Sequence, residues 1–170
     1  VLNSKMLAYP IKMLDMCPTS DGACAMIFAS EQKAKKICPN PAWVITAGTR
    51  HDQPFGGDLE MVVNLRTLRS ATEEAYRIAG IRDPLRDFDV AELYEPCTFA
   101  ELSWSEATAF CGPGEGGKLM DSGATQMDGE LPVNPSGGVL STNCIGATAM
   151  IRVAEAAIQV MGKGGKRQVP

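Results

Sequence analysis

The chain has 170 residues, of which 45% are hydrophobic and 21% are charged, a composition typical of a folded globular protein. Lys and Arg total 16 against 20 Asp and Glu, so no strong positive field is available for nucleic acid or anionic lipid. No apolar run approaches the roughly 20 residues that cross a bilayer, and no charged-then-apolar leader opens the chain. We therefore expect a cytoplasmic protein without a membrane segment, and we interpret both ends as cuts in a longer polypeptide.

The six cysteines are scattered along the chain, with no Cys-x-x-Cys pair and only His51 to complete a zinc site. We therefore expect no metal site. Five of the six stand beside apolar residues, Gly or Ala, which favours small buried side chains in a reducing compartment.

The first patterned segments predict a strand, a helix and a second strand. Residues 22–29 (GACAMIFA) form a continuous run of small and apolar residues, as a strand buried on both faces should. Ser30 then caps a lysine-rich helix that reaches Ile37, and residues 43–47 (WVITA) supply the second buried strand. This order is typical of an α/β fold with a parallel sheet.

The next part of the chain predicts a loop and a helix. Residues 48–57 are polar and glycine-bearing, and residues 59–68 are apolar but ambiguous between helix and strand. Ser70 and Glu73 have the spacing of a capping box, which predicts a helix that ends near Gly80.

A second strand-to-helix unit follows. Residues 88–93 predict a short strand, and residues 98–101 (TFAE) form another capping box ahead of a helix. The loop between them stands where α/β folds collect ligands and catalytic groups. Two long connections rich in Gly and Pro, 111–117 and 121–138, come next. Residues 145–161 predict a buried central helix, because Ala and Met are spread around its circumference.

Four motifs give the chain a family resemblance. Residues 131–138 read LPVNPSGG and lead to IGAT at 145–148, which resembles the Asn-Pro-Ser-Gly-Gly loop and Gly-Ala-Thr helix start of the thiolase superfamily. Residues 17–25 (CPTSDGACA) resemble the Ser-Asp-Gly-Ala-Ala strand start of that family. Residues 92–102 (ELYEPCTFAEL) resemble the catalytic loop of its sterol-carrier-type branch.

The resemblance implies an α/β, thiolase-like layered fold that contains the end of the first half plus most of the second half. By this interpretation residues 1–40 end the amino-terminal half. Residues 41–170 form the carboxyl-terminal half, incomplete at its end. The cysteine nucleophile of the family would lie outside this chain.

Thiolase-type enzymes form an acyl-cysteine and an enolate on coenzyme A thioesters, so they need donors for a negative thioester oxygen. The family's Gly-His-Pro turn is replaced here by residues 142–144, which places Asn143 where the histidine stands, and Tyr94 replaces the Asn or His of the catalytic loop. Both side chains can donate a hydrogen bond, but neither carries protons well near pH 7. Any general base must come from elsewhere.

Other roles stay open for these residues. Tyr94 can be a core aromatic whose hydroxyl is satisfied, and Asn143 can cap the following helix. Cys144, near a helix start, is a further candidate nucleophile. We interpret Cys97 as a packing residue. His51 is either a surface residue or a contact of the coenzyme.

The resemblance also implies the ligands and partners. Ser136, Gly137 and Gly138, with Gly48 and Thr49, would contact coenzyme A, which is a substrate; no cofactor would be bound permanently. The expected function is cleavage of a bulky or branched 3-oxoacyl-CoA, as in the benzoylsuccinyl-CoA thiolase-like subgroup, by a homodimer that works with a small zinc-ribbon and OB-fold subunit. The alternatives are a thiolase-like retro-aldolase acting on a CoA thioester and a non-catalytic CoA-binding scaffold subunit.

Overall fold

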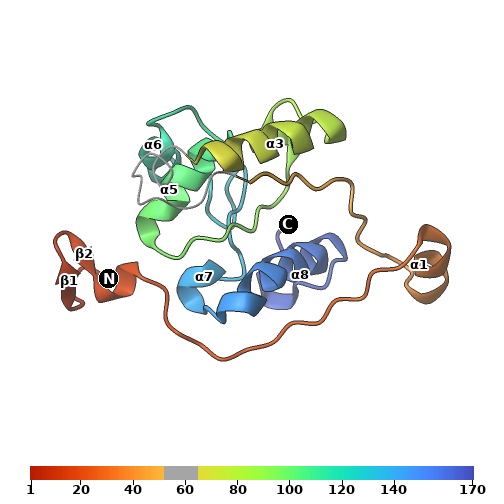
Figure 1. The fold of residues 1–170 in the computed structure, drawn as a ribbon, viewed down its shortest axis with the longest axis horizontal. Coiled ribbons are helices and arrows are strands. Elements are labelled where there is room, and N and C mark those ends of the chain that lie inside the picture. Colours follow the sequence, from red (N-terminus) through yellow and green to blue (C-terminus); the bar gives the residue numbers. More distant parts are fainter. Residues whose placement is uncertain (52–64) are drawn as a thin grey trace.

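The structure is a computed structural model that describes residues 1–51 and 65–170 of the chain (Figure 1). The expected loop at 48–57 and the ambiguous stretch 59–68 therefore lie mostly outside the described residues. The helices are α1 (Glu31–Ile37), α3 (Arg66–Ala79), α4 (Pro84–Asp87), α5 (Thr98–Ala107), α6 (Gly116–Asp121), α7 (Gly138–Ser141) and α8 (Thr148–Val160). Short 3-10 helices are η1 (Met13–Asp15), η2 (Ile145–Ala147) and η3 (Gly165–Arg167), and β1 (Met6–Ala8) pairs antiparallel with β2 (Ile11–Lys12).

The apolar core lies where α3, α5 and α6 gather, and Figure 1 shows these helices as one group. Phe110, Leu119 and Leu131 are its buried centre. Phe88 stacks between Tyr76 and Phe110, with ring centroids 5.6 Å and 6.4 Å apart, and so fastens α3 to this core. The Tyr76 hydroxyl donates to the Thr108 carbonyl at 2.8 Å, and burial raises the pKa of Tyr76 to about 12.

The two expected strands at 22–29 and 43–47 are extended but unpaired, so the strand prediction is wrong for these segments as the structure describes them. Figure 1 shows them as long coils that lead to and from α1, the helix that was predicted between them. Ile27 is 91% exposed and Ile45 is 72% exposed. A continuous apolar run signals burial on both faces, but a strand also needs neighbours, and none of the described residues supplies them.

Both capping boxes are wrong, although both helices exist. Helix α3 begins at Arg66, one turn before Ser70, and Leu65 at φ 45° is its cap residue. Ser70 lies inside the helix, and its hydroxyl accepts a hydrogen bond from Arg50 Nε at 3.1 Å. Helix α5 begins at Thr98 itself, whose hydroxyl donates to Asp15 Oδ1 at 3.2 Å instead of capping. The predicted end of α3 is confirmed, because Gly80 closes it at φ 77°.

The carboxyl-terminal segments depart from expectation in two ways. The strand expected at 88–93 is reduced to one parallel bridge between Ala91 and Val133, and the 111–117 connection runs into α6. Helix α8 is confirmed but is not buried all round. Its buried residues are Thr148, Arg152 and Gln159, whereas its apolar Val153 is 52% exposed. Thr148 and Arg152 bind the loops described next, whereas Gln159 bonds the carboxyl-terminal tail at Arg167 and Val169.

Candidate functional site

The glycine loop at 131–138 is fastened to the segment that precedes Tyr94. Ala91 N–H donates to the Pro132 carbonyl at 3.0 Å, and the Ala91 carbonyl accepts from Asn134 N–H at 2.7 Å. Leu93 N–H donates to Asn134 Oδ1 at 2.7 Å. Asn134 has φ 53°, a left-handed conformation that Asn tolerates better than most residues. These bonds fix the loop and the Tyr94 segment as one unit.

A buried ion pair holds the same loop against α8. Arg152 Nη1 lies 2.9 Å from Glu92 Oε2, and their side chains are 6% and 1% exposed. Ser136 completes the group: its hydroxyl donates to Glu92 at 2.8 Å and accepts from Arg152 at 2.6 Å. Burial raises the pKa of Glu92, and the bonds from Ser136 and the charge of Arg152 oppose this. The hydrogen bonds of the Ser136 hydroxyl are therefore made to other residues of the protein.

A second buried carboxylate, Glu95, holds the far end of the loop. Its side chain is 1% exposed, and its Oε1 accepts N–H bonds from Val139 at 2.7 Å and Leu140 at 3.3 Å, at the start of α7. Gly138 (φ 62°) makes room for it, since a Cβ there would stand 1.9 Å from that oxygen. Gly137 is also left-handed, at φ 93°. The left-handed backbone thus favours glycine at both positions, and the closeness of Glu95 also requires it at Gly138.

The segment 15–20 joins the Tyr94 loop to the turn at Asn143. Cys17 N–H donates to the Pro96 carbonyl at 2.9 Å. Three residues later, Ser20 N–H donates to the Asn143 carbonyl at 3.0 Å, and Ser20 Oγ accepts from Asn143 N–H at 3.3 Å. The two loops that carry the predicted donors therefore meet across this segment.

The Asn143 side chain is 8% exposed, and both ends of its amide are engaged. Its Oδ1 accepts from Ile145 N–H at 3.1 Å and from the Thr148 hydroxyl at 3.0 Å, at the starts of η2 and α8, although the cap residues of these helices are Cys144 and Ala147. Its Nδ2 donates to Cys17 Sγ at 3.1 Å. The oxygen thus orients the amide, and the donor side points at a thiol.

The remaining candidates in this region have more ordinary surroundings. The half-buried Tyr94 ring packs 6.1 Å from the Trp104 ring, centroid to centroid. Cys97 is 5% exposed, and burial raises the pKa of its thiol. Cys144 points its sulfur at Gly22, where a Cβ would come within 2.4 Å. The expectation of buried cysteines holds for Cys97 alone; the other five are half-buried.

The structure places Gly48 and Thr49 beside α3 rather than in the network around Asn143. A Cβ on Gly48 would stand 2.1 Å from the Ala71 carbonyl oxygen of that helix. An open pocket of about 250 Å³ lies next to them, lined by Arg50, His51, Arg66, Thr67 and Ser70. His51 is exposed. Arg50 is the basic residue next to Thr49 in this pocket, and it is already paired with Glu74.

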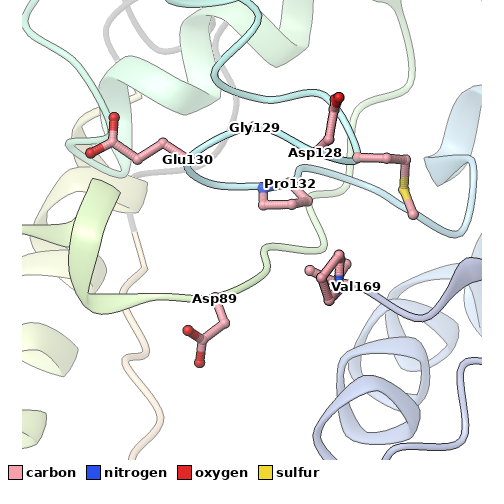
Figure 2. A pocket seen from close by; sticks show the side chains of 8 residues that line it. Asp89, Asp128, Gly129, Glu130, Pro132 and Val169 are labelled. Atoms are coloured by element: carbon pink, nitrogen blue, oxygen red, sulfur yellow. The ribbon is translucent and has the colours of Figure 1, made fainter.

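A different pocket, of about 210 Å³, lies between the turn at 127–130 and the carboxyl end (Figure 2). Its carboxylates are Asp89, Asp128 and Glu130, and none of the predicted site residues lines it. An acidic lining repels the phosphates of a coenzyme. We therefore place the candidate site at the Asn143 and Tyr94 loops.

Sequence reasoning missed the residues that hold the site together: Cys17, Glu92, Glu95 and Arg152. One signal was available, because charged residues are almost never fully buried unless paired, and Arg152 stands in a mostly apolar helix whose other charged residue is Glu155. In the described part of the chain, no group of three or more His, Cys, Asp or Glu residues could hold a metal ion. Within the same residues, no helix has both the length and the apolar character needed to cross a membrane.

The chain resembles several known proteins. It is 32% identical over 170 residues to an acetyl-CoA acetyltransferase of Methanothermobacter thermautotrophicus, covering 99% of this chain and 44% of that protein. It is 34% identical over 176 residues to sterol carrier protein 2 of Bos taurus, covering 100% of this chain and 32% of that protein. Against the benzoylsuccinyl-CoA thiolase subunit BbsB of Thauera aromatica, the identity is 30% over 169 residues, covering 94% and 41%.

One solved structure, named as the Ltp2-ChsH2(DUF35) aldolase, matches 98% of this chain and 44% of its own with a TM-score of 0.76. Its 24% sequence identity supports the fold alone. The chain spans less than half the length of these relatives. Residues 48–170 match the family described as thiolase C-terminal domain-like. The fold is therefore thiolase-like, and the chain belongs to the thiolase C-terminal domain-like family.

Proposed function

We propose that this chain is part of a thiolase-type acyltransferase that cleaves a 3-oxoacyl-CoA with coenzyme A. The acyl-cysteine of this reaction would form on a nucleophile outside the chain. The observation that carries the proposal is the Asn143 amide, which is buried, held by its oxygen, and placed where the Tyr94 loop and the 142–144 turn meet across Cys17.

The chemistry asks for donors fixed before the reaction. A primary amide has two N–H groups, and one of those on Asn143 is directed at Cys17. The second can donate to a thioester oxygen as negative charge develops there, and the Tyr94 phenol supplies another donor. An oriented donor in a dry site lowers a barrier by about 3 kcal/mol. The Asn143 amide is not ionisable, so the proton carriers belong to the rest of the enzyme.

The coenzyme is proposed as a substrate, with no cofactor bound permanently. Ser136, Gly137 and Gly138 would border its thioester end by close approach of the backbone, since the Ser136 hydroxyl and the three N–H groups are bonded within the protein. Gly48 and Thr49 precede Arg50 and His51, which line an open pocket, and are proposed as coenzyme contacts there. A cytoplasmic homodimer in acyl-CoA degradation, assisted by a small zinc-ribbon and OB-fold subunit, completes the proposal.

A second candidate function is retro-aldol cleavage of a CoA thioester. The observation that favours it is Tyr94, because a phenol can donate a hydrogen bond to, or accept one from, the hydroxyl of an aldol substrate. Asn143 fits both reactions. The two differ in one requirement: a thiolase consumes coenzyme A and passes through an acylated cysteine, whereas an aldolase needs neither.

The test is an assay of the complete protein with a panel of 3-oxoacyl-CoA and 3-hydroxyacyl-CoA thioesters, each with and without free coenzyme A. The thiolase proposal expects cleavage that depends on coenzyme A, together with an acyl adduct on a cysteine in the intact-mass spectrum. Cleavage of the 3-hydroxy compounds without coenzyme A would establish the aldolase instead. Binding without turnover of either class would leave a scaffold subunit and overturn both.

A further inference from the structure

Glu95 joins the two segments that carry the proposed donors. It follows Tyr94 in the sequence, so its backbone belongs to the Tyr94 loop. Its Oε1 accepts the N–H groups of Val139 at 2.7 Å and Leu140 at 3.3 Å. Those residues begin α7, which ends at Ser141, two residues before Asn143. One carboxylate, 1% exposed, therefore connects both sides of the site.

A buried donor without a partner in the described part of the chain lies beside this carboxylate. Glu95 Oε2 and Asn134 Nδ2 are both buried without a geometrically satisfied partner among the described residues, and one is an acceptor while the other is a donor. Both groups flank Gly138, where a Cβ would stand 1.9 Å from Glu95 Oε1 and 2.9 Å from Asn134 Nδ2. The Asn134 amide cannot turn over, because its Oδ1 accepts Leu93 N–H at 2.7 Å.

The electrostatic surroundings agree with this arrangement. Burial raises the pKa of Glu95, and the backbone N–H groups around it and the nearby Asn134 side chain oppose that effect. On α5, the pKa of Glu101 is raised by burial and by the charge of Glu95. The carboxylate is therefore bonded on the α7 side and has the Asn134 amide as a neighbour.

We propose that Glu95 is a positioning residue for the acyl transfer: its carboxylate, clasped between the Asn134 amide and the N–H groups of α7, sets the separation of Tyr94 and Asn143. This inference rests on the proposed function. It concerns how the two donors are aligned, and it assigns Glu95 no proton transfer.

The test is a swap of donor and acceptor in the complete enzyme. Glu95→Gln keeps the length of the side chain and an acceptor for α7, but it turns an N–H group toward the Asn134 N–H group. Asn134→Asp sets two carboxylates against each other, and Asp tolerates the φ of 53° at this position. Each single variant should lower kcat about 10-fold or more with KM nearly unchanged.

The double variant Glu95→Gln with Asn134→Asp restores one donor opposite one acceptor, in reversed order. Its kcat should return to within about 3-fold of the wild type, since the coupling between neighbouring groups is what the cycle measures. Glu130→Gln, at an exposed carboxylate, is the matched control and should leave kcat unchanged. Urea unfolding of the wild type, the two single variants and the double variant measures the coupling without an activity assay.

Three results would overturn the positioning role: additive losses of kcat in the cycle, additive losses of stability, or single variants that are less stable but fully active once folded. If the wild type transfers no acyl group, the proposed function fails separately. The unfolding cycle then still decides the pairing, and an additive result there ends this inference too.

Discussion

The side-chain amide of Asn143 donates to the thiol of Cys17 across 3.1 Å, although these residues stand at opposite ends of the chain. Cys17 is also tied by its backbone N–H to the Pro96 carbonyl in the Tyr94 loop, at 2.9 Å. The contact therefore brings three motifs of the sequence to one point. Its chemistry can be tested by changing one end of the amide at a time.

Asn143→Asp removes the donor while it keeps the Oδ1 acceptor that holds Ile145 and Thr148. We expect kcat to fall roughly 100-fold or more with KM nearly unchanged, because the lost bond acts mainly in the transition state. Stability should stay closer to wild type than in Asn143→Ala, which also loses the acceptor for Ile145 and Thr148 and about 1 kcal/mol. Steady-state kinetics and melting temperatures on both variants separate the roles; a fully active Asn143→Asp enzyme would leave Asn143 with a structural role only.

Tyr94→Phe tests the phenol without disturbing the ring beside Trp104. If the hydroxyl donates to the reacting oxygen, kcat should fall about 10-fold to 100-fold, and the melting temperature should hardly change. We further expect the tips of Tyr94 and Asn143 to face one another with room for one water or substrate oxygen between them. A ligand-bound crystal structure of the complete enzyme would measure that gap, and wild-type kcat in the Phe variant would assign Tyr94 to packing.

Gly138→Ala should destabilise the protein by about 2 kcal/mol or more, because it combines a left-handed backbone with a collision at Glu95. Gly117→Ala is the matched control. Its φ is not in the left-handed range and nothing lies within 4 Å of an added Cβ, so the change inside α6 should be neutral or gain less than about 1 kcal/mol. Equal effects in urea unfolding would contradict the close fit described for Gly138.

Glu101→Gln should change how stability depends on pH. Burial first, and then the charge of Glu95, raise the pKa of Glu101 above its ordinary 4.5, so the folded protein binds this proton more tightly than the unfolded chain. The free energy of unfolding therefore falls as pH rises from about 4.5 through the raised pKa. The variant lacks this loss and should gain stability relative to wild type across that range. Unfolding curves from pH 4 to 8 that stay parallel would refute the effect, and Glu130→Gln is the exposed control.

Residues 1–170 expressed alone should show no thiolysis and poor stability. Exposed apolar side chains such as Ile27, Phe28 and Val44, at 91%, 71% and 67%, offer unpaired extended segments to other molecules. We expect strong binding of a hydrophobic dye and aggregation in sedimentation experiments. Cleavage of a 3-oxoacyl-CoA by this fragment would show that the nucleophile does not lie elsewhere.

The sequence predicted the fold best where local physics is sufficient. Helices α1, α3, α5 and α8 follow from periodicity and breakers, and Gly80 ends α3 as expected. The strand predictions for 22–29 and 43–47 are wrong, because a continuous apolar run indicates that a segment favours burial but does not show that a neighbouring strand is present. The capping-box predictions are wrong because residues remote in sequence bind the two hydroxyls: Arg50 binds that of Ser70, and Asp15 binds that of Thr98.

The candidate site was likewise predicted only in part from the sequence. Its motifs placed Tyr94, Asn143 and the glycine loop in one region, and the roles of these residues stay predictions. The supporting contacts could not be foreseen, since Glu95 reaches α7 and Cys17 reaches Asn143 only after the chain has folded. Residues with weak local preferences are placed by tertiary contacts, which a single sequence does not reveal.

The buried pair of Glu92 and Arg152 also constrains how this protein can evolve. Losing one member strands a charge in the interior and costs about 3–5 kcal/mol, whereas replacing both with well-packed apolar residues is often neutral. A mutational path between these two states passes through a protein that folds poorly. The pair, 2.9 Å apart, should therefore be easier to replace at both positions together than at either position alone.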